Sequence, residues 1–164
     1  MNTIKVFIPG EPAAKERHRS GKGGRIYTPA KTHKAEQALR QNWIAANMEH
    51  FGSVHTFDEP VRIKVRFYFA PLKSFPKWEM RLIRHGTTIP KHTKPDIDNL
   101  LKLVLDALNG VAYKDDSLVT RIICEKCYSD KGPGTEIEIY RVELPEKNKA
   151  VVTQADVIEE SRYF

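Results

Sequence analysis

The feature that most constrains the fold is an apolar repeat of helical period between residues 97 and 109. Its spacing of i, i+3, i+4 and i+7 predicts an α-helix that turns one face toward a hydrophobic core. The stripe consists of Leu101, Val104, Leu105 and Leu108. Asp96 suits the N-cap of this helix, and Gly110 suits the left-handed position just past its last turn. The sequence therefore predicts a short core helix with well-defined ends.

Alternating apolar residues predict strands on both sides of this helix, over residues 3–8, 60–70, 117–128 and 135–143. A second helix is expected over 30–48, with Leu39 and Trp43 inward, because Thr28 followed by Pro29 is a helix start signal. We expect residues 9–27 to form a flexible basic loop and residues 71–94 a mobile loop with a short helix over 78–84. The order β-α-β-α-β-β predicts an α+β fold, with a mixed β-sheet and two main helices.

The composition is that of a single basic globular domain. The chain has 164 residues, of which 40% are hydrophobic, so it is long enough for a substantial core. We expect the domain to span residues 1–144, followed by a charged and loosely structured tail over 145–164. A net charge of +6 favours a polyanionic partner. Two cysteines, no long apolar run and no signal-peptide core predict a cytoplasmic protein without a membrane segment.

Acidic residues flank the predicted helix at both ends. Asp96 and Asp98 stand at its start, Lys102 follows one turn later, and Asp115 and Asp116 come after its end. Mg²⁺ prefers several oxygen ligands, so clustered carboxylates on a basic chain are suited to holding Mg²⁺ against a phosphodiester. We expect the turn after the helix to lead the second acid pair back to the helix start. The alternative is a solvated helix start, with Asp98 and Lys102 as an ordinary surface ion pair.

The segments KPDIDNLLKLVLDAL and YKDDSLV resemble the signature of RusA-type Holliday junction resolvases, a family common in bacterial prophages. The opening segment IPGEPAAKERHR is similar to that family's first strand and basic turn. The resemblance implies a Mg²⁺-dependent endodeoxyribonuclease, a homodimer with two active sites, that resolves four-way DNA junctions by paired symmetric nicks. Carried over by position, the catalytic residues are Asp96, Asp98, Lys102 and Asp116, with the three aspartates as metal ligands. A slightly shorter loop before the second acid pair leaves the choice between Asp115 and Asp116 open.

Several basic side chains are candidates for DNA contact, namely Lys15, Arg17, Arg19 and Lys94. The resemblance supports Lys15 and Arg17, and the alternative for these residues is a solvated loop. The polar face of the strand over 60–70 is also cationic, because it carries Arg62, Lys64 and Arg66.

Trp78 lies close to Arg81 and Arg84 in the sequence. Such a group can track or wedge a DNA strand, and the alternative is that the indole covers a local hydrophobic patch.

Three functions are consistent with these features. The first is the junction resolvase, and the second is a less selective structure-specific nuclease that cuts flaps and other branched DNA. The third is a non-catalytic DNA-binding protein of the same fold. The acidic residues argue against the third, because negative charge that faces phosphates weakens DNA binding.

Overall fold

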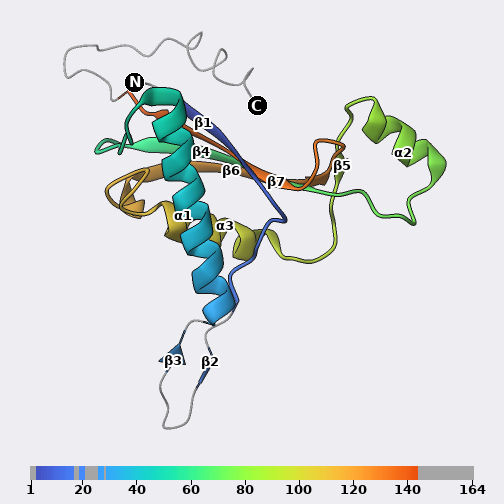
Figure 1. The fold of residues 1–164 in the computed structure, drawn as a ribbon, viewed down its shortest axis with the longest axis horizontal. Helices are drawn as coiled ribbons and strands as arrows, with labels where there is room; N and C mark the ends of the chain where they lie inside the picture. Colours follow the sequence, from blue (N-terminus) through green and yellow to red (C-terminus); the bar gives the residue numbers. More distant parts are fainter. Residues whose placement is uncertain (1–2, 17–18, 21–25, 28, 144–164) are drawn as a thin grey trace, which may run out of the picture.

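A computed structural model describes residues 3–16, 19–20, 26–27 and 29–143, which fold around one five-stranded β-sheet. In spatial order its strands are β1 (Thr3–Pro9), β7 (Gly134–Arg141), β4 (Val61–Phe69), β6 (Val119–Tyr128) and β5 (Ile89–Pro90). β4 and β6 run parallel, whereas the other neighbouring strands are antiparallel (Figure 1). The predicted α+β fold with a mixed sheet is therefore confirmed. A parallel pair needs a long crossover, and the crossover from β4 to β6 carries the helix with the acidic ends.

Alternation in β1 and in most of β4 separates an apolar face of the sheet from a polar one, because successive side chains point to opposite faces. In β1 the buried residues are Ile4, Val6 and Ile8, and the residues between them are exposed. The buried series of β4 is Val61, Ile63, Val65, Phe67 and Phe69. Only the apolar face needs a cover, and two helices supply it.

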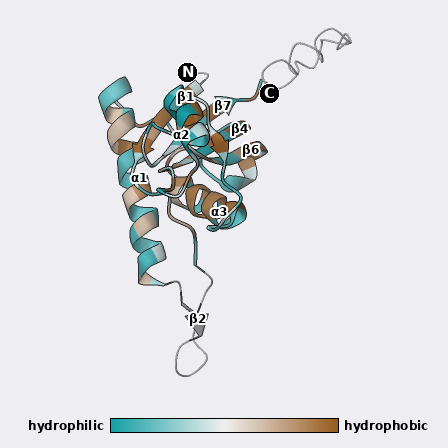
Figure 2. Ribbon diagram, turned by 90° about the vertical axis from the view of Figure 1, so that its right-hand side faces the viewer, coloured by the Kyte–Doolittle hydropathy of each residue, from teal (hydrophilic) through white to brown (hydrophobic). Residues whose placement is uncertain are grey.

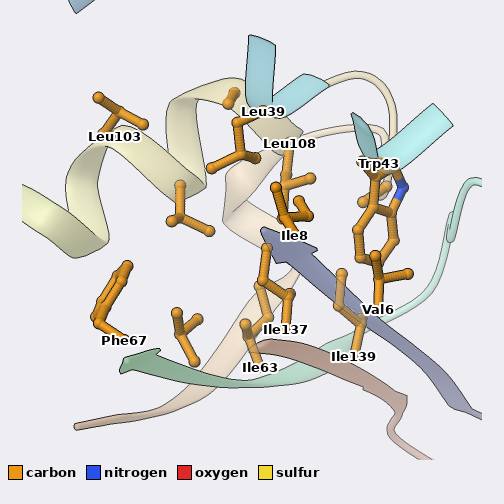
Figure 3. Packing of buried hydrophobic residues seen from close by; sticks show 14 of the residues in the cluster. Val6, Ile8, Leu39, Trp43, Ile63, Phe67, Leu103, Leu108, Ile137 and Ile139 are labelled. Atoms are coloured by element: carbon orange, nitrogen blue, oxygen red, sulfur yellow. The ribbon is translucent and has the colours of Figure 1, made fainter. Parts of the chain in front are cut away.

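Helices α1 (Ala30–Phe51) and α3 (Ile97–Leu108) pack on the apolar face of the sheet (Figure 1). Leu39 and Trp43 of α1 are buried, as predicted, and face Val6, Ile137 and Ile139 of the sheet (Figure 3). Each such side chain contributes about 1.5–3 kcal/mol of hydrophobic stabilisation when fully buried. The rest of α1 is mostly hydrophilic, whereas α3 is mostly apolar (Figure 2).

Helix α3 has nearly the predicted bounds, but the predicted core stripe is wrong in part. The buried residues are Leu100, Leu103, Val104, Ala107 and Leu108. Leu101 and Leu105 are only half-buried, and Ile97, which lies on the same side of the helix, is 38% exposed. Because α3 is apolar around most of its circumference, periodicity alone does not select its buried face. Contact with α1 and the sheet selects it.

The polar face of β4 is less cationic than the sequence indicates, because glutamates of β7 lie opposite its basic residues. The strand register pairs Lys64 with Glu138 and Arg66 with Glu136. Arg66 also binds Glu125 of β6. Carboxylates therefore lie beside Lys64 and Arg66, which reduces the positive charge of this face.

Three short elements complete the described part of the chain. β2 (Arg19–Ser20) pairs with β3 (Ile26–Tyr27) in the segment that was expected to be a loop. Helix α2 (Lys77–Arg84) confirms the short helix predicted over 78–84 and stands away from the body of the domain in Figure 1. A 3₁₀ turn, η1 (Asp116–Leu118), precedes β6. No helix in the described segments is long and apolar enough to cross a membrane. The tail over 145–164 lies outside the described residues.

Candidate active site

Two exposed aspartates mark the start of α3. The backbone of Asp96 occupies the predicted N-cap position, and Asp98 lies in the first turn. The Asp96 side chain makes no capping hydrogen bond, although a carboxylate at this position normally accepts one from the helix backbone. Both carboxylates stand at the positive end of the helix dipole, which stabilises their negative charge. Their oxygens are thus available as ligands for a hard cation.

The backbone before α3 is held by a lysine of the neighbouring strand. The ammonium of Lys126 donates to the carbonyl oxygen of Thr93 at 2.9 Å and to that of Pro95 at 2.5 Å. Lys126 was not among the site residues predicted from the sequence. Its signal is the strand alternation, which puts this lysine on the apolar side of β6 in register with Phe67. A lysine on that side needs polar partners, and the loop that carries the acid pair supplies them.

Lys102 is exposed one turn after Asp98, on the same side of α3. The next residue in this series, Asp106, does not orient Lys102, because its carboxylate contacts the ammonium of Lys15. Lys15 also lies 3.3 Å from the carboxylate of Glu36 on α1. Burial lowers the pKa of Lys15, but the two carboxylates outweigh it and hold that pKa above its ordinary value. Lys15 is therefore engaged within the protein, which weakens its candidacy as a phosphate contact.

In the second acid pair, the carboxylate of Asp115 has a structural role, whereas that of Asp116 is available to a ligand. Asp115 accepts a hydrogen bond from the backbone N–H of Ser117 at 2.9 Å and so caps η1, which lowers the pKa of Asp115. Asp116 is exposed, and within the described part of the chain its carboxylate makes no hydrogen bond or ion pair. Of the two candidates that the sequence left open, Asp116 has the carboxylate that is available to a ligand.

Asp116 lies beside the second half of α3. The hydroxyl of Tyr113 donates to the carbonyl oxygen of Leu105 at 2.9 Å. Burial and then the charges of Asp116 and Asp106 raise the pKa of that hydroxyl. Tyr113 is bridged to Asn109 at the end of α3, and Asp116 follows Tyr113 by three residues.

The expectation that the turn returns the second acid pair to the helix start is therefore wrong for a single chain. α3 and β6 run in opposite directions, since Lys126 near the end of β6 meets the start of α3 (Figure 1). Seven residues separate Asp98 from Leu105, which corresponds to roughly 10 Å along a helix axis. Consistently, the described residues contain no group of three or more acidic, histidine or cysteine side chains arranged to hold a metal ion.

The other side chains predicted to contact DNA are Lys94, Arg17 and Arg19. Lys94 is exposed two residues before Asp96. Arg17 lies outside the described residues, and for Arg19 only the backbone, in β2, is described.

The two readings of Trp78 are separated by its exposure. The side chain is 61% exposed, so it covers no large hydrophobic patch in the described part of the chain.

Comparison with known proteins places the chain in a family. Residues 9–140 match the family described as Endodeoxyribonuclease RusA. The chain therefore belongs to the RusA endodeoxyribonuclease family. It is also similar to a protein of Bacillus subtilis (strain 168) named Uncharacterized protein YqaN. The two sequences are 34% identical over 147 residues, which cover 87% of this chain and 99% of the relative.

Proposed function

We propose that this protein is a Mg²⁺-dependent endonuclease that resolves four-way DNA junctions by paired symmetric nicks. The observation that carries the proposal is the exposed pair Asp96 and Asp98 at a helix start of a RusA-family chain, whose carboxylates have no partner among the described residues. Two free carboxylates in such a position are costly for a protein that only binds phosphates. They are useful where a cation must be held against a phosphodiester.

The proposed roles follow from the chemistry of each group. Asp96 and Asp98 would hold the cation from the helix start, and Asp116 would supply a third carboxylate. When bound, the cation would supply positive charge against the phosphate oxygens and a more acidic water. Lys102, exposed one turn from Asp98, would donate to the scissile phosphate. Lys94 and the basic segment with Arg17 and Arg19 would contact flanking phosphates.

A homodimer would bring together carboxylates that lie far apart within one chain. Because Asp116 lies near the far end of α3, the acid pair has no third carboxylate beside it among the described residues of its own chain. A two-fold axis that brings Asp116 of a second copy to Asp96 and Asp98 would build two equivalent sites, one for each strand to be cut. The half-buried apolar side of α3, with Ile97 38% exposed, is a suitable contact surface beside these residues.

The test compares DNA substrates at equal ionic strength. Purified protein is incubated with a mobile four-way junction, a flap and a linear duplex, with Mg²⁺ or with chelator. We expect paired nicks in the four-way junction alone, and only with Mg²⁺. Equal cleavage of all three substrates would support the less selective nuclease instead. Junction binding without cleavage at any Mg²⁺ concentration would support the non-catalytic protein.

A further inference from the structure

Helix α2 presents an apolar and cationic face that no described segment of the chain covers. Trp78 and Leu82 are 61% and 42% exposed, and Arg81 lies between them on the same side at i+3 from the tryptophan. We call these three residues the outer face of α2. On the opposite side of the helix Ile83 is 1% exposed and anchors α2 to the domain.

We call residues 71–94, the segment that carries α2, the arm. Both ends of the arm are attached to the domain. The rings of Phe75 and Tyr128 meet edge to face with centroids 4.8 Å apart. Lys91, on the other side of α2 in the chain, donates to the Tyr128 hydroxyl at 3.2 Å. Both ends of the α2 segment are thus fixed to the last residue of β6. The outer face is therefore held in a defined place, and a ligand that binds it gains from this preorganisation.

The arm carries unneutralised positive charge. Residues 71–94 contain six lysines and arginines and a single acid, Glu79. No ion pair joins these six cations to a described residue. Some cations elsewhere in the described residues, such as Lys5, Lys15 and Arg66, are instead bound to carboxylates. Charge complementarity thus points to a polyanion at the arm.

The arm lies at the same end of the sheet as the acid pair. β5, which follows α2, pairs with the last two residues of β6. One residue earlier in β6, Lys126 holds the loop that leads to Asp96 (Figure 1). A DNA strand that reaches the carboxylates can therefore continue onto α2.

We propose that the outer face of α2 binds a DNA strand next to the cleavage point, with Trp78 stacked on a base that the branch leaves unpaired and Arg81 on a neighbouring phosphate. This inference rests on the proposed function in so far as branched DNA is the substrate. An exposed indole gains most from an unpaired base, because bases within a duplex already stack on each other. A second copy of the chain fits the face less well, because a two-fold contact would bring Arg81 and Lys77 of both copies together.

The first measurement is equilibrium binding in chelator, which keeps the DNA uncut. Fluorescence anisotropy compares forked DNA having unpaired bases with a fully paired duplex of equal length. Trp78→Ala should weaken binding to forked DNA by about 5- to 100-fold and leave duplex affinity nearly unchanged. Trp78→Phe should restore most of the affinity, since a phenyl ring also stacks. Phe51→Ala is the matched control, because Phe51 is an aromatic side chain, 39% exposed, on α1.

A second readout uses the two tryptophans of the chain, of which Trp43 is fully buried. Forked DNA should quench the fluorescence of the wild-type protein by stacking on Trp78, and this quenching should disappear in Trp78→Phe. Wild-type affinity of Trp78→Ala for forked DNA would overturn the inference. So would a shift of Trp78→Ala to a smaller oligomer in sedimentation without loss of DNA affinity, since a second copy would then be the occupant.

The proposed function and the proposal about α2 can each be contradicted without the other. A wild-type protein that binds forked DNA through Trp78 but never cuts would contradict the proposed function alone. A protein that cuts junctions while Trp78→Ala binds forked DNA normally would contradict the inference about α2 alone.

Discussion

Lys15 and Asp106 lie 91 positions apart in the chain, and the ammonium of the first contacts the carboxylate of the second. Glu36 of α1 lies 3.3 Å from the same ammonium. The backbone N–H of Lys15 also donates to the carbonyl oxygen of Asn99 at 2.9 Å. One lysine thus joins the N-terminal loop, α1 and the side of α3 that carries Lys102. This contact therefore adds to the apolar packing that holds the candidate catalytic helix in place.

Replacing Lys15 by methionine should lower stability. The Lys15 side chain is 17% exposed but that of Asp106 is 38% exposed, so solvent screening limits the coupling to about 1 kcal/mol. A double-mutant cycle with Asp106→Asn, followed by urea unfolding, measures this energy. Lys34→Met, at an exposed position on α1, is the control. A coupling of zero would show that the contact does not hold α3.

The contact between Lys15 and Asp106 should also make the stability of the protein depend on pH. Although burial opposes it, Asp106 and Glu36 raise the pKa of Lys15 above its ordinary value of 10.5. A raised pKa means that the stabilisation is complete below pH 10.5 and is lost as the pH rises through the folded-state pKa. The stability difference between wild type and Lys15→Met should therefore be constant from about pH 7 to 9 and shrink above about pH 10.5. A difference that grows in that upper range would contradict this assignment.

Asp98→Asn should reduce junction cleavage by at least about 100-fold, because losing groups that merely orient metal ligands already costs up to that much. Junction affinity in chelator should be retained or increased, since a negative charge that faces phosphates is removed. Asp58→Asn is a suitable control, because Asp58 is an exposed acid paired with Lys114. Cleavage by Asp98→Asn at the wild-type rate would remove that residue from the proposed site.

Substitution of the two acids after α3 should have different effects on cleavage in the same assay. Asp116→Asn should abolish cleavage while leaving the folded structure intact, because its carboxylate is exposed and has no described partner. Asp115→Asn should keep cleavage, since its carboxylate caps η1 through Ser117. The reverse result would make Asp115 the ligand.

Mixed dimers should show whether the site is shared between chains. If Asp116 of one copy completes the acid pair of the other, a dimer of Asp98→Asn with Asp116→Asn contains one fully intact site. Mixing the two inactive variants, after mild unfolding and refolding to exchange chains, should therefore restore nicking of one strand per junction. A mixture as inactive as its components would indicate that each site comes from a single chain.

Local patterns predicted most of the fold. Strand alternation fixed the buried series of β4, and the proline at position 29 marked the start of α1. The buried face of α3 escaped prediction because Leu101 and Leu105 satisfy the helical period as well as Leu100 and Leu103 do. Only packing against α1 and the sheet distinguishes these faces.

For the candidate site, the sequence indicated which acidic side chains are exposed better than it indicated how they are arranged in space. The availability of Asp96 and Asp98 follows from a local pattern, the start of a helix. The place of Asp116 depends on the antiparallel packing of α3 and β6, which no short segment encodes. The role of Lys126 likewise appears only once β6 lies beside the loop before α3.

The most direct test of the account is the product of the wild-type protein with a mobile four-way junction, resolved on a denaturing gel with Mg²⁺ and with excess chelator. The account predicts nicks at symmetric positions in two opposing strands with Mg²⁺ and intact strands with chelator. Intact strands under both conditions, or the same nicks in chelator, would contradict it.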